Sequence, residues 1–388
     1  MNLNTDSNHK ERVDGVGIYI HIPFCKQACF YCDFHFSTSL KKKDELIDAL
    51  IVELELRKSE FENDTVATIY FGGGTPSLLS LEEIETILKA VYDNYSVIEN
   101  PEITLEANPD DLSETKILEL AKSNINRLSI GVQSFFEADL KLMNRAHNAT
   151  EAKHCLELAT QYFDNISVDL IYGIPGATHE QWQENIQTVL DFNIPHISSY
   201  ALTVEPKTAL ATLIKKGKIE DVDEVHAEAQ FHMLINQLKE AGFIHYELSN
   251  FSKPGYFSIN NSAYWKGKKY IGIGPSAHSF SGESRSWNIS NNSKYIQAIQ
   301  LKTLPSEIEI LSVNDKYNEY VMTGLRTIWG VSLETIVAVF GSDFKTYILA
   351  QADKYLNEEL LYIEDNNLKV TTKGKFLSDG IASQLFKI

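Results

Sequence analysis

Three of the four cysteines of this chain, Cys25, Cys29 and Cys32, lie within eight residues of one another. They directly follow a predicted strand, and their spacing lets a short irregular loop turn three thiolates toward one point. Thiolates are soft ligands that suit iron–sulfur clusters, zinc or copper(I). Most iron–sulfur clusters take four cysteines, but Cys155 lies far along the chain on a predicted helix, Glu151–Tyr162. A cluster held here would leave one iron open to a small molecule.

Two other interpretations of these cysteines stay open at this point. Cys25, Cys29, Cys32 and His35 would complete the four nitrogen and sulfur ligands of a structural zinc site. The three thiols could also be structural and bind nothing. We expect Cys155 to be a small buried hydrophobic residue.

Further candidate residues lie near the ends of successive predicted strands. Gly72–Thr75 directly follows the second strand, and glycines there let the backbone approach a ligand closely. Glu106 ends the third strand, where a carboxylate could accept hydrogen bonds from hydroxyl or amino groups. Gln133, Arg145 and Asp169 fall near the ends of the fourth and fifth strands. A plain turn, surface or capping role is the alternative for each residue, but their shared placement favours a site.

The elements that position these residues alternate along the chain. Apolar runs typical of buried strands recur between helical patterns, at Gly17–Ile22, Val66–Phe71, Glu102–Glu106, Arg127–Val132, Ser167–Tyr172 and His196–Leu202. Ser80 with Glu83 and Thr178 with Gln181 form capping boxes that open two of the helices. Gly242 is expected to end a later helix.

Six strands with intervening helices predict a parallel α/β core over residues 15–250, after a polar tail of residues 1–14. The pattern does not separate an open sheet from a full or partial barrel. In either case we expect the functional site at the carboxyl ends of the strands.

Beyond residue 250 the alternation stops. Residues 251–311 are predicted to be a connecting segment with short strands such as Lys269–Ile273. Residues 312–388 read as a small helical domain with helices near 315–328 and 344–357. A hairpin of Leu361–Ile363 and Leu368–Thr371, with a polar turn between its strands, and a final helix follow. Helices with a terminal hairpin suggest a winged-helix-like unit.

Composition excludes several classes of function. The 388 residues carry 35 Lys and Arg against 53 Asp and Glu, a formal net charge of −18. This balance argues against a general nucleic-acid binder and against docking on anionic lipid through charge alone. No run approaches the ~20 apolar residues of a membrane span. The polar first sixteen residues lack a secretion signal, so we expect a cytoplasmic protein.

The stretch around the cysteines, Tyr19-Ile-His-Ile-Pro-Phe-Cys25-x3-Cys29-Phe-Tyr-Cys32-Asp-Phe, is similar to the signature of radical S-adenosylmethionine (SAM) enzymes. More narrowly, it resembles the oxygen-independent coproporphyrinogen III oxidase-like group, and the heme chaperone branch HemW most of all. The resemblance covers nearly the whole chain, through the segments Gly72–Pro76, Glu106–Pro109, Ser129–Ser134, Asp169–Pro175, Tyr246–Asn250 and Gly272–Ala277.

This resemblance implies a partial (β/α)6 barrel, a 4Fe-4S cluster on the three cysteines and SAM on the fourth iron. It also implies that Gly73, Gly74 and Thr75 hold the SAM amino group and that Arg145 suits its carboxylate. Tyr19 and Tyr31 would flank the cluster or SAM. The SAM-binding residues implied in all are Tyr19, Tyr31, Gly73, Gly74, Thr75, Glu106, Gln133, Arg145 and Asp169.

The family implies either of two functions. One is oxidative decarboxylation of coproporphyrinogen III to protoporphyrinogen IX, a coproporphyrinogen dehydrogenase activity. The other is heme binding and delivery to heme-receiving proteins, with an electron donor such as flavodoxin or ferredoxin. The decarboxylase usually carries a further Cys where this chain has Phe34, and a longer segment before the cluster than the 24 residues found here. Both features favour the chaperone, and a structural zinc protein is the remote alternative.

One departure concerns heme. The chaperone branch typically shows His-Asn-x-x-Tyr-Trp, whereas this chain has Asn260-Asn261-x-x-Tyr264-Trp265. Asparagine does not supply the imidazole that commonly ligates heme iron. His278 is the candidate substitute, with a histidine satisfied in a loop as the alternative. Tyr264 and Trp265 could stack on a porphyrin or belong to the core.

Overall fold

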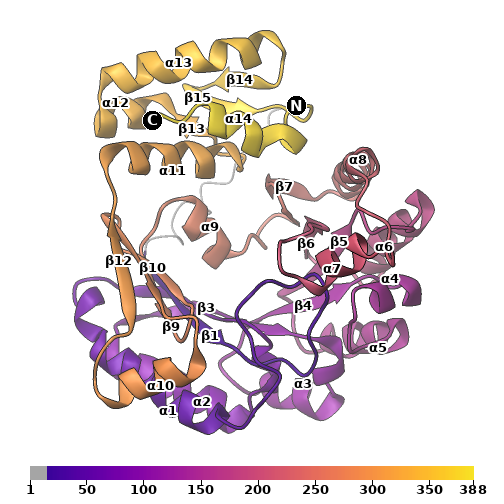
Figure 1. Cartoon of the computed structure of the whole chain (residues 1–388), viewed down its shortest axis with the longest axis vertical. Helices are drawn as coiled ribbons and strands as arrows, with labels where there is room; N and C mark the ends of the chain where they lie inside the picture. The colour runs from indigo at the N-terminus through magenta and orange to yellow at the C-terminus, as the bar shows by residue number, and fades with distance from the viewer. Residues whose placement is uncertain (1–14) are drawn as a thin grey trace.

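The computed structural model describes residues 15–388 (Figure 1). The predicted polar tail, residues 1–14, lies outside the described residues. One mixed sheet of twelve strands organises most of the chain, in the order β12-β11-β10-β9-β1-β2-β3-β4-β5-β6-β8-β7. Its strands are β1 (Val16–Ile22), β2 (Val66–Gly73), β3 (Val97–Ala107), β4 (Arg127–Gln133), β5 (Ile166–Tyr172), β6 (His196–Ala201), β7 (Ile244–Glu247), β8 (Asn250–Ser252), β9 (Tyr270–Ile273), β10 (His278–Phe280), β11 (Ser284–Asn288) and β12 (Ser306–Ile310).

The six predicted strands are all present as β1 to β6, and they pair in parallel and in sequence order. β1 pairs on its other edge with β9, also in parallel, while β6 pairs with the antiparallel strand β8. The sheet is therefore not closed into a full barrel, and its six parallel strands with their helices form the partial (β/α)6 barrel that the resemblance implies. Residues 251–311 do more than connect two units, because they contribute β9 to β12 to the same sheet.

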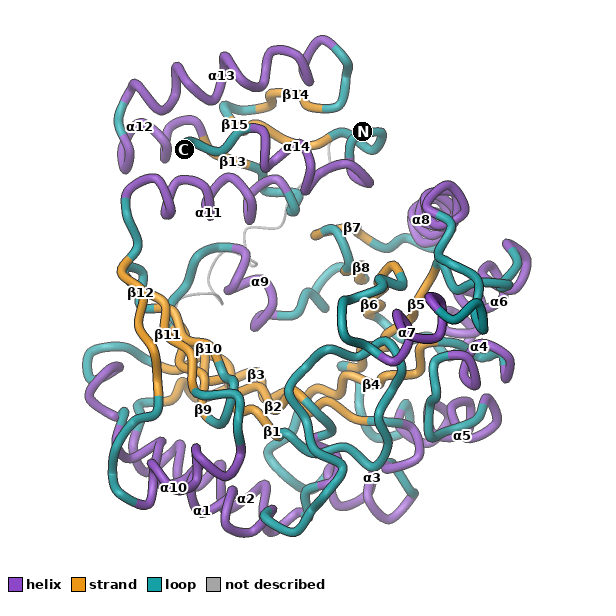
Figure 2. Tube along the Cα trace, viewed as in Figure 1, coloured by secondary structure: helices purple, strands orange, loops and turns teal. Residues whose placement is uncertain are grey.

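Helices pack around the parallel strands (Figure 2). They are α1 (Lys43–Leu56), α2 (Leu81–Asn94), α3 (Glu114–Leu120), α4 (Glu137–Leu142), α5 (Ala149–Ala159), α6 (His179–Asp191), α7 (Ala209–Lys215), α8 (Glu224–Glu240), α9 (Ile259–Trp265) and α10 (Asn292–Gln300). Both predicted capping boxes open helices, Ser80 with Glu83 on α2 and Thr178 with Gln181 on α6. Gly242, with a φ of +77°, follows the end of α8 as expected. Cys155 is buried on α5.

The two faces of the parallel sheet differ in chemistry. On β1, Ile18 and Ile20 belong to the hydrophobic core, whereas Tyr19 alternates with them and stacks on Tyr70 of β2 on the opposite face. Strands buried on both faces were expected to be apolar on both. Here the inner face is polar, because it carries the side chains that line a site.

The C-terminal residues form a second hydrophobic cluster, centred on buried side chains from Tyr317 to Leu385. Its elements are α11 (Val313–Leu325), β13 (Val331–Ser332), α12 (Leu333–Phe340), α13 (Ser342–Asn357), β14 (Leu361–Glu364), β15 (Asn367–Val370) and α14 (Ser378–Gln384), with the strands ordered β13-β15-β14. The predicted hairpin is present, and its turn residues Asp365 and Asn366 both have positive φ, as tight hairpin turns require. The sequence analysis missed α12 and β13. Among the described helices, none combines the length and the apolar character needed to cross a membrane.

A buried carboxylate joins α1 to the later strands. Glu53 is fully buried and accepts hydrogen bonds from Tyr295 Oη at 2.5 Å, Asn288 Nδ2 at 2.7 Å and the Gly274 amide at 2.8 Å. Arg57 lies 3.4 Å away and donates to the Gly272 carbonyl. Burial raises the pKa of the Glu53 carboxyl. These contacts anchor the segment that carries β9 against the helix layer.

We predict that Tyr295→Phe lowers the free energy of unfolding by about 2 kcal/mol, because it removes a hydrogen bond to a buried carboxylate. Urea denaturation at pH 7 measures this change. Tyr92→Phe is the matched control, since Tyr92 is 43% exposed, and it should leave the free energy nearly unchanged. Equal stability of the two variants would contradict the anchoring role of Glu53.

Candidate functional site

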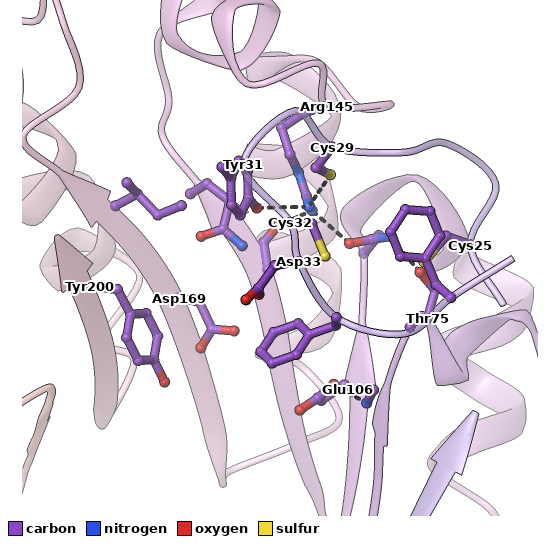
Figure 3. Close-up of a pocket in the computed structure, with 18 of the residues that line it drawn as sticks. Cys25, Cys29, Tyr31, Cys32, Asp33, Thr75, Glu106, Arg145, Asp169 and Tyr200 are labelled. Atoms are coloured by element: carbon purple, nitrogen blue, oxygen red, sulfur yellow. Dashed lines mark hydrogen bonds between the residues drawn. The ribbon is translucent and has the colours of Figure 1, made fainter. Parts of the chain in front are cut away.

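A cavity of about 440 Å³ opens at the carboxyl ends of the parallel strands (Figure 3). Asp169 and Tyr200 lie across this cavity from Cys25 and Thr75. The predicted residues that line it are Cys25, Cys29, Tyr31, Cys32, Gly73, Gly74, Thr75, Glu106, Gln133, Arg145 and Asp169. The cavity lies at the carboxyl ends of the parallel strands, where ligands of such sheets bind.

The cysteines lie on the loop between β1 and α1. Hydrogen bonds hold the two ends of this loop together. The Cys25 amide donates to the Ser37 carbonyl at 3.1 Å, and the Ser37 amide donates to the Pro23 carbonyl at 2.9 Å. Burial raises the pKa of the Cys25 thiol and raises that of Cys32 to about 11. Metal ligation requires the thiolates, so binding a cluster would release protons.

The arrangement of the thiols fits a cluster better than a single ion. Within residues 15–388, no three His, Cys, Asp or Glu side chains are gathered in the way that one metal ion requires. The three thiols instead line one cavity, as suits a cluster in which each cysteine binds a different iron. His35, the proposed fourth zinc ligand, does not line this cavity, and its Nε2 lies 2.7 Å from Asn292 Oδ1. The structure does not support His35 as a ligand.

The glycine loop after β2 lies directly against the start of the cysteine loop. The Gly74 amide donates to the Ile22 carbonyl at 2.9 Å, and a Cβ at Gly74 would lie 2.7 Å from the Phe24 carbonyl oxygen. Gly73 has a φ of +105°, and a Cβ there would lie 2.4 Å from the His21 ring. Side chains at either position would push the two loops apart, so glycine is required for this contact.

Arg145 connects the cysteine loop to two strand ends. Its Nη1 donates to Cys29 Sγ at 3.3 Å and to Tyr31 Oη at 3.4 Å. Its Nη2 donates to Asn108 Oδ1 at 2.6 Å and to the Gly131 carbonyl at 2.7 Å. The guanidinium fork that was expected to bind a carboxylate is thus engaged by four acceptors of the protein itself, and only Nε has none.

Two carboxyl groups lie at the base of the cavity. Glu106 accepts hydrogen bonds from Tyr70 Oη at 2.8 Å and from the Gly73 amide at 3.1 Å, which orients the glycine loop. Asp169 accepts from Ser129 Oγ at 3.3 Å. Burial raises the pKa of Glu106 to about 7 and that of Asp169 to about 6. A cationic ligand bound beside these carboxyl groups would stabilise their charged forms and so lower their pKa values.

Gln133, at the end of β4, has a φ of +69°, a backbone conformation that non-glycine residues rarely adopt. It follows a register shift between β4 and β5. Strained backbone of this kind is concentrated at functional sites. The observation supports the placement of Gln133 beside a ligand.

Several lining residues were missed by the sequence analysis, among them Asp33, Asn108, Tyr200 and Glu205. Asn108 directly follows β3, and Tyr200 lies near the end of β6. Applying the strand-end rule to every strand would have found both. Phe34 also lines the cavity and is 68% exposed at its mouth.

Tyr19 and the heme candidates do not line this cavity. Tyr19 lies behind the glycine loop, where its hydroxyl is 3.3 Å from His21 Nδ1. Asn260 is buried on α9, where its Oδ1 accepts from Thr68 Oγ1 at 2.9 Å. On the same helix, the ring of Tyr264 packs edge-on to Tyr270, and Trp265 lies beneath Arg326. Asn261 also lies on α9, where its amide donates to the capping Ser258 Oγ at 3.2 Å, whereas His278 lies apart and is exposed on β10.

We predict that Glu106→Gln makes the chain, freed of cofactors, more stable than the wild type at pH 8, with a difference that shrinks toward pH 5. Between about pH 4.5 and 7 the unfolded carboxyl is ionised while the folded one keeps its proton, so wild-type stability falls as pH rises. The expected difference at pH 8 is about 3 kcal/mol. Urea denaturation across this range measures it, and a difference independent of pH would contradict the raised pKa.

The comparisons with known proteins agree with this geometry. The model of the Radical SAM superfamily matches residues 19–189, and the model of the HemN C-terminal domain matches residues 311–377. The protein named heme chaperone HemW from Lactococcus lactis is 34% identical over 364 residues, covering 94% of this chain and 95% of that protein. Its namesake from Bacillus subtilis is 32% identical, covering 94% and 97%.

Among solved structures, coproporphyrinogen III oxidase (HemN) from Escherichia coli matches with a TM-score of 0.83 and 23% identity, covering 97% of this chain and 92% of that one. This likeness establishes a shared fold. The similarity in sequence to the chaperones extends over almost their whole length. The chain therefore belongs to the HemW family within the radical SAM superfamily.

Proposed function

We propose that this protein is a heme chaperone, which binds a 4Fe-4S cluster, SAM and heme and delivers heme to acceptor proteins. The observation that carries this proposal is the similarity over nearly the full length to several relatives named as heme chaperones. Phe34, where the decarboxylase branch usually has Cys, supports the same choice. We further propose that it works in the cytoplasm with a flavodoxin- or ferredoxin-type electron donor.

Members of the radical SAM superfamily bind a 4Fe-4S cluster and SAM. We assign the cluster to Cys25, Cys29 and Cys32, because all three thiols line one cavity and a fourth cysteine does not. When bound, the cluster and SAM supply one-electron chemistry. The chain's own contribution is to hold the thiols in position and to exclude water from the base of the cavity.

For SAM, the cavity offers two kinds of partner. The backbone of Gly73 and Gly74 is accessible from the cavity, and the buried carboxyls of Glu106 and Asp169 would favour the cationic ligand. Arg145 is better suited to positioning Cys29 than to binding the SAM carboxylate, because its fork already has four acceptors.

For heme, we propose His278 as the axial ligand. Asn260 is unsuited, since it is buried and its amide oxygen already accepts a hydrogen bond from Thr68. His278 is exposed, and its ring stacks on Trp287 with 6.0 Å between centroids. An exposed imidazole beside an indole ring offers both a ligand for iron and an apolar surface for a porphyrin.

We predict that Cys29→Ser loses the cluster and with it SAM cleavage. The wild type, reconstituted anaerobically with iron and sulfide, should show broad absorption near ~400 nm and bound iron. Cys155→Ala is the matched control and should retain full iron, because Cys155 is buried on α5 away from the cavity. Full iron content in Cys29→Ser would contradict the ligand assignment.

We predict that hemin binds the wild type and that His278→Ala weakens the binding about tenfold, the effect of losing roughly 1.4 kcal/mol of ligation. A spectrophotometric titration measures this change. His154→Ala is the control, since His154 is also an exposed histidine and lies on α5.

A coproporphyrinogen assay on the same sample separates the two branches of the family. Decarboxylated product without hemin uptake would overturn the chaperone proposal. Unchanged hemin affinity in His278→Ala would overturn only the choice of ligand.

A further inference from the structure

A second cavity, of about 390 Å³, lies where the sheet edge at β7 meets the C-terminal unit. We call it the junction cavity. Figure 1 shows β7 on the side of the sheet that faces this unit. An isolated bridge between Glu247 and Thr327, and a hydrogen bond of 3.0 Å from the Ile328 amide to the Tyr246 carbonyl, hold the walls together. It shares no residue with the cysteine cavity.

The groups that face the junction cavity are basic. Arg326, Lys369 and Lys375 line it, and its lining contains no Asp or Glu. Arg326 pairs with Asp379 and Lys369 with Glu364, but both carboxylates are more than half exposed and lie outside the lining. All charged side chains that line this cavity are therefore basic, whereas the chain as a whole carries a net charge of −18.

Two buried polar atoms of this cavity have no partner. Ser378 is only 2% exposed and lines the cavity, yet its Oγ makes no hydrogen bond in the described structure. The Nε of Arg326 is also buried without an acceptor. Buried polar groups are normally satisfied, and exceptions of this kind call for a bound group. Arg326 Nε can only donate and the Ser378 hydroxyl is able to donate, so an acceptor in the cavity would satisfy both atoms.

The Lys375 ammonium forms a hydrogen bond to a neutral ring and not to a carboxylate. His245 Nε2 donates to the Leu248 carbonyl at 3.0 Å, so its Nδ1 is the acceptor for Lys375 Nζ at 2.7 Å. This neutral ring is the only hydrogen-bond partner of the Lys375 ammonium in the described part of the chain. Burial lowers the pKa of Lys375 to about 8, and the charge of the nearby Glu247 offsets this lowering only in part. Glu247 lies nearby, and its Oε1 accepts hydrogen bonds from Asn250 and from the Ser249 amide, whereas its Oε2 is buried without a partner among the described residues.

We propose that the junction cavity binds a small oxyanion, a phosphate or carboxylate group, through Lys375, the Ser378 hydroxyl and Arg326 Nε. Such an anion would give an acceptor to Ser378 Oγ and to Arg326 Nε, and an anionic partner to the Lys375 ammonium. It would also join β7 to the C-terminal unit, because His245 and Lys375 come from the two sides. This site is independent of the proposed heme function.

Calorimetric titration of the full chain with inorganic phosphate and, separately, with succinate tests the proposal at pH 7 and constant ionic strength. We expect the wild type to bind at least one of the two anions. Binding of phosphate or of succinate then identifies the class of oxyanion. Lys375→Gln and Ser378→Ala should each weaken binding about tenfold, through loss of a charged and a neutral donor.

Lys373→Gln is the matched control. It removes the same charge two residues away, but Lys373 is exposed and its Nζ donates to the Glu358 carbonyl outside the cavity. It should bind as the wild type does. Circular dichroism melts show whether each variant is folded. If Lys375→Gln does not fold, the affinity of Ser378→Ala tests the proposal. The proposal is overturned if neither anion binds the wild type at about 10 mM, or if Lys373→Gln weakens binding as much as Lys375→Gln.

Discussion

The candidate site depends on one guanidinium group. Arg145 donates to a cysteine of the loop after β1, to Asn108 after β3 and to a carbonyl of β4, so three separate segments share one rigid, planar donor. Asn108 in turn donates to Thr75 of the glycine loop. A lysine could not replace Arg145, because a point charge cannot satisfy several acceptors in fixed directions. The positions of the thiols are thus set by backbone that lies far away in the sequence.

The polar side chains on the inner face of the sheet lower the stability of the fold, and the apolar packing on the outer face offsets this loss. Glu106 and Asp169 are buried with pKa values raised by that burial, and the charge of Arg127 lowers both values only in part. The apolar contacts between the strands and the helices α1, α2, α5 and α6 supply the stability that tolerates these groups. Such a division is expected where function requires groups that are unfavourable for folding.

Local patterns in the sequence predict the fold well wherever the interactions are local. The strands β1 to β6, both capping boxes and the Asp365–Asn366 turn follow from periodicity and short-range hydrogen bonding. The pairing of β9 with β1 could not be predicted, because the two strands are distant in sequence and no local signal encodes their contact. The strand-end rule located the cysteine cavity, including Gln133 and Asp169.

The details of the site were less predictable. The hydrogen bonds of Arg145 to Asn108 and to the Gly131 carbonyl join segments distant in sequence, so only the packed structure reveals them. His35 follows the cysteines at a plausible ligand spacing, yet its ring is held by Asn292 of α10, on a distant part of the chain. Spacing along a loop therefore indicates which residues can meet, and packing decides which of them do.

The pairing of β1 with β9 has a consequence for the newly synthesised chain. β1 carries the cysteine loop, but one of its edges stays unpaired until residues 270–273 have been made. At ~5–20 residues per second, this takes on the order of ten seconds or more after the cysteines leave the ribosome. During that interval the loop follows a strand with one unpaired edge, so the sheet that supports the thiols is incomplete. Once β9 closes that edge, the cluster-binding loop is held against a completed sheet.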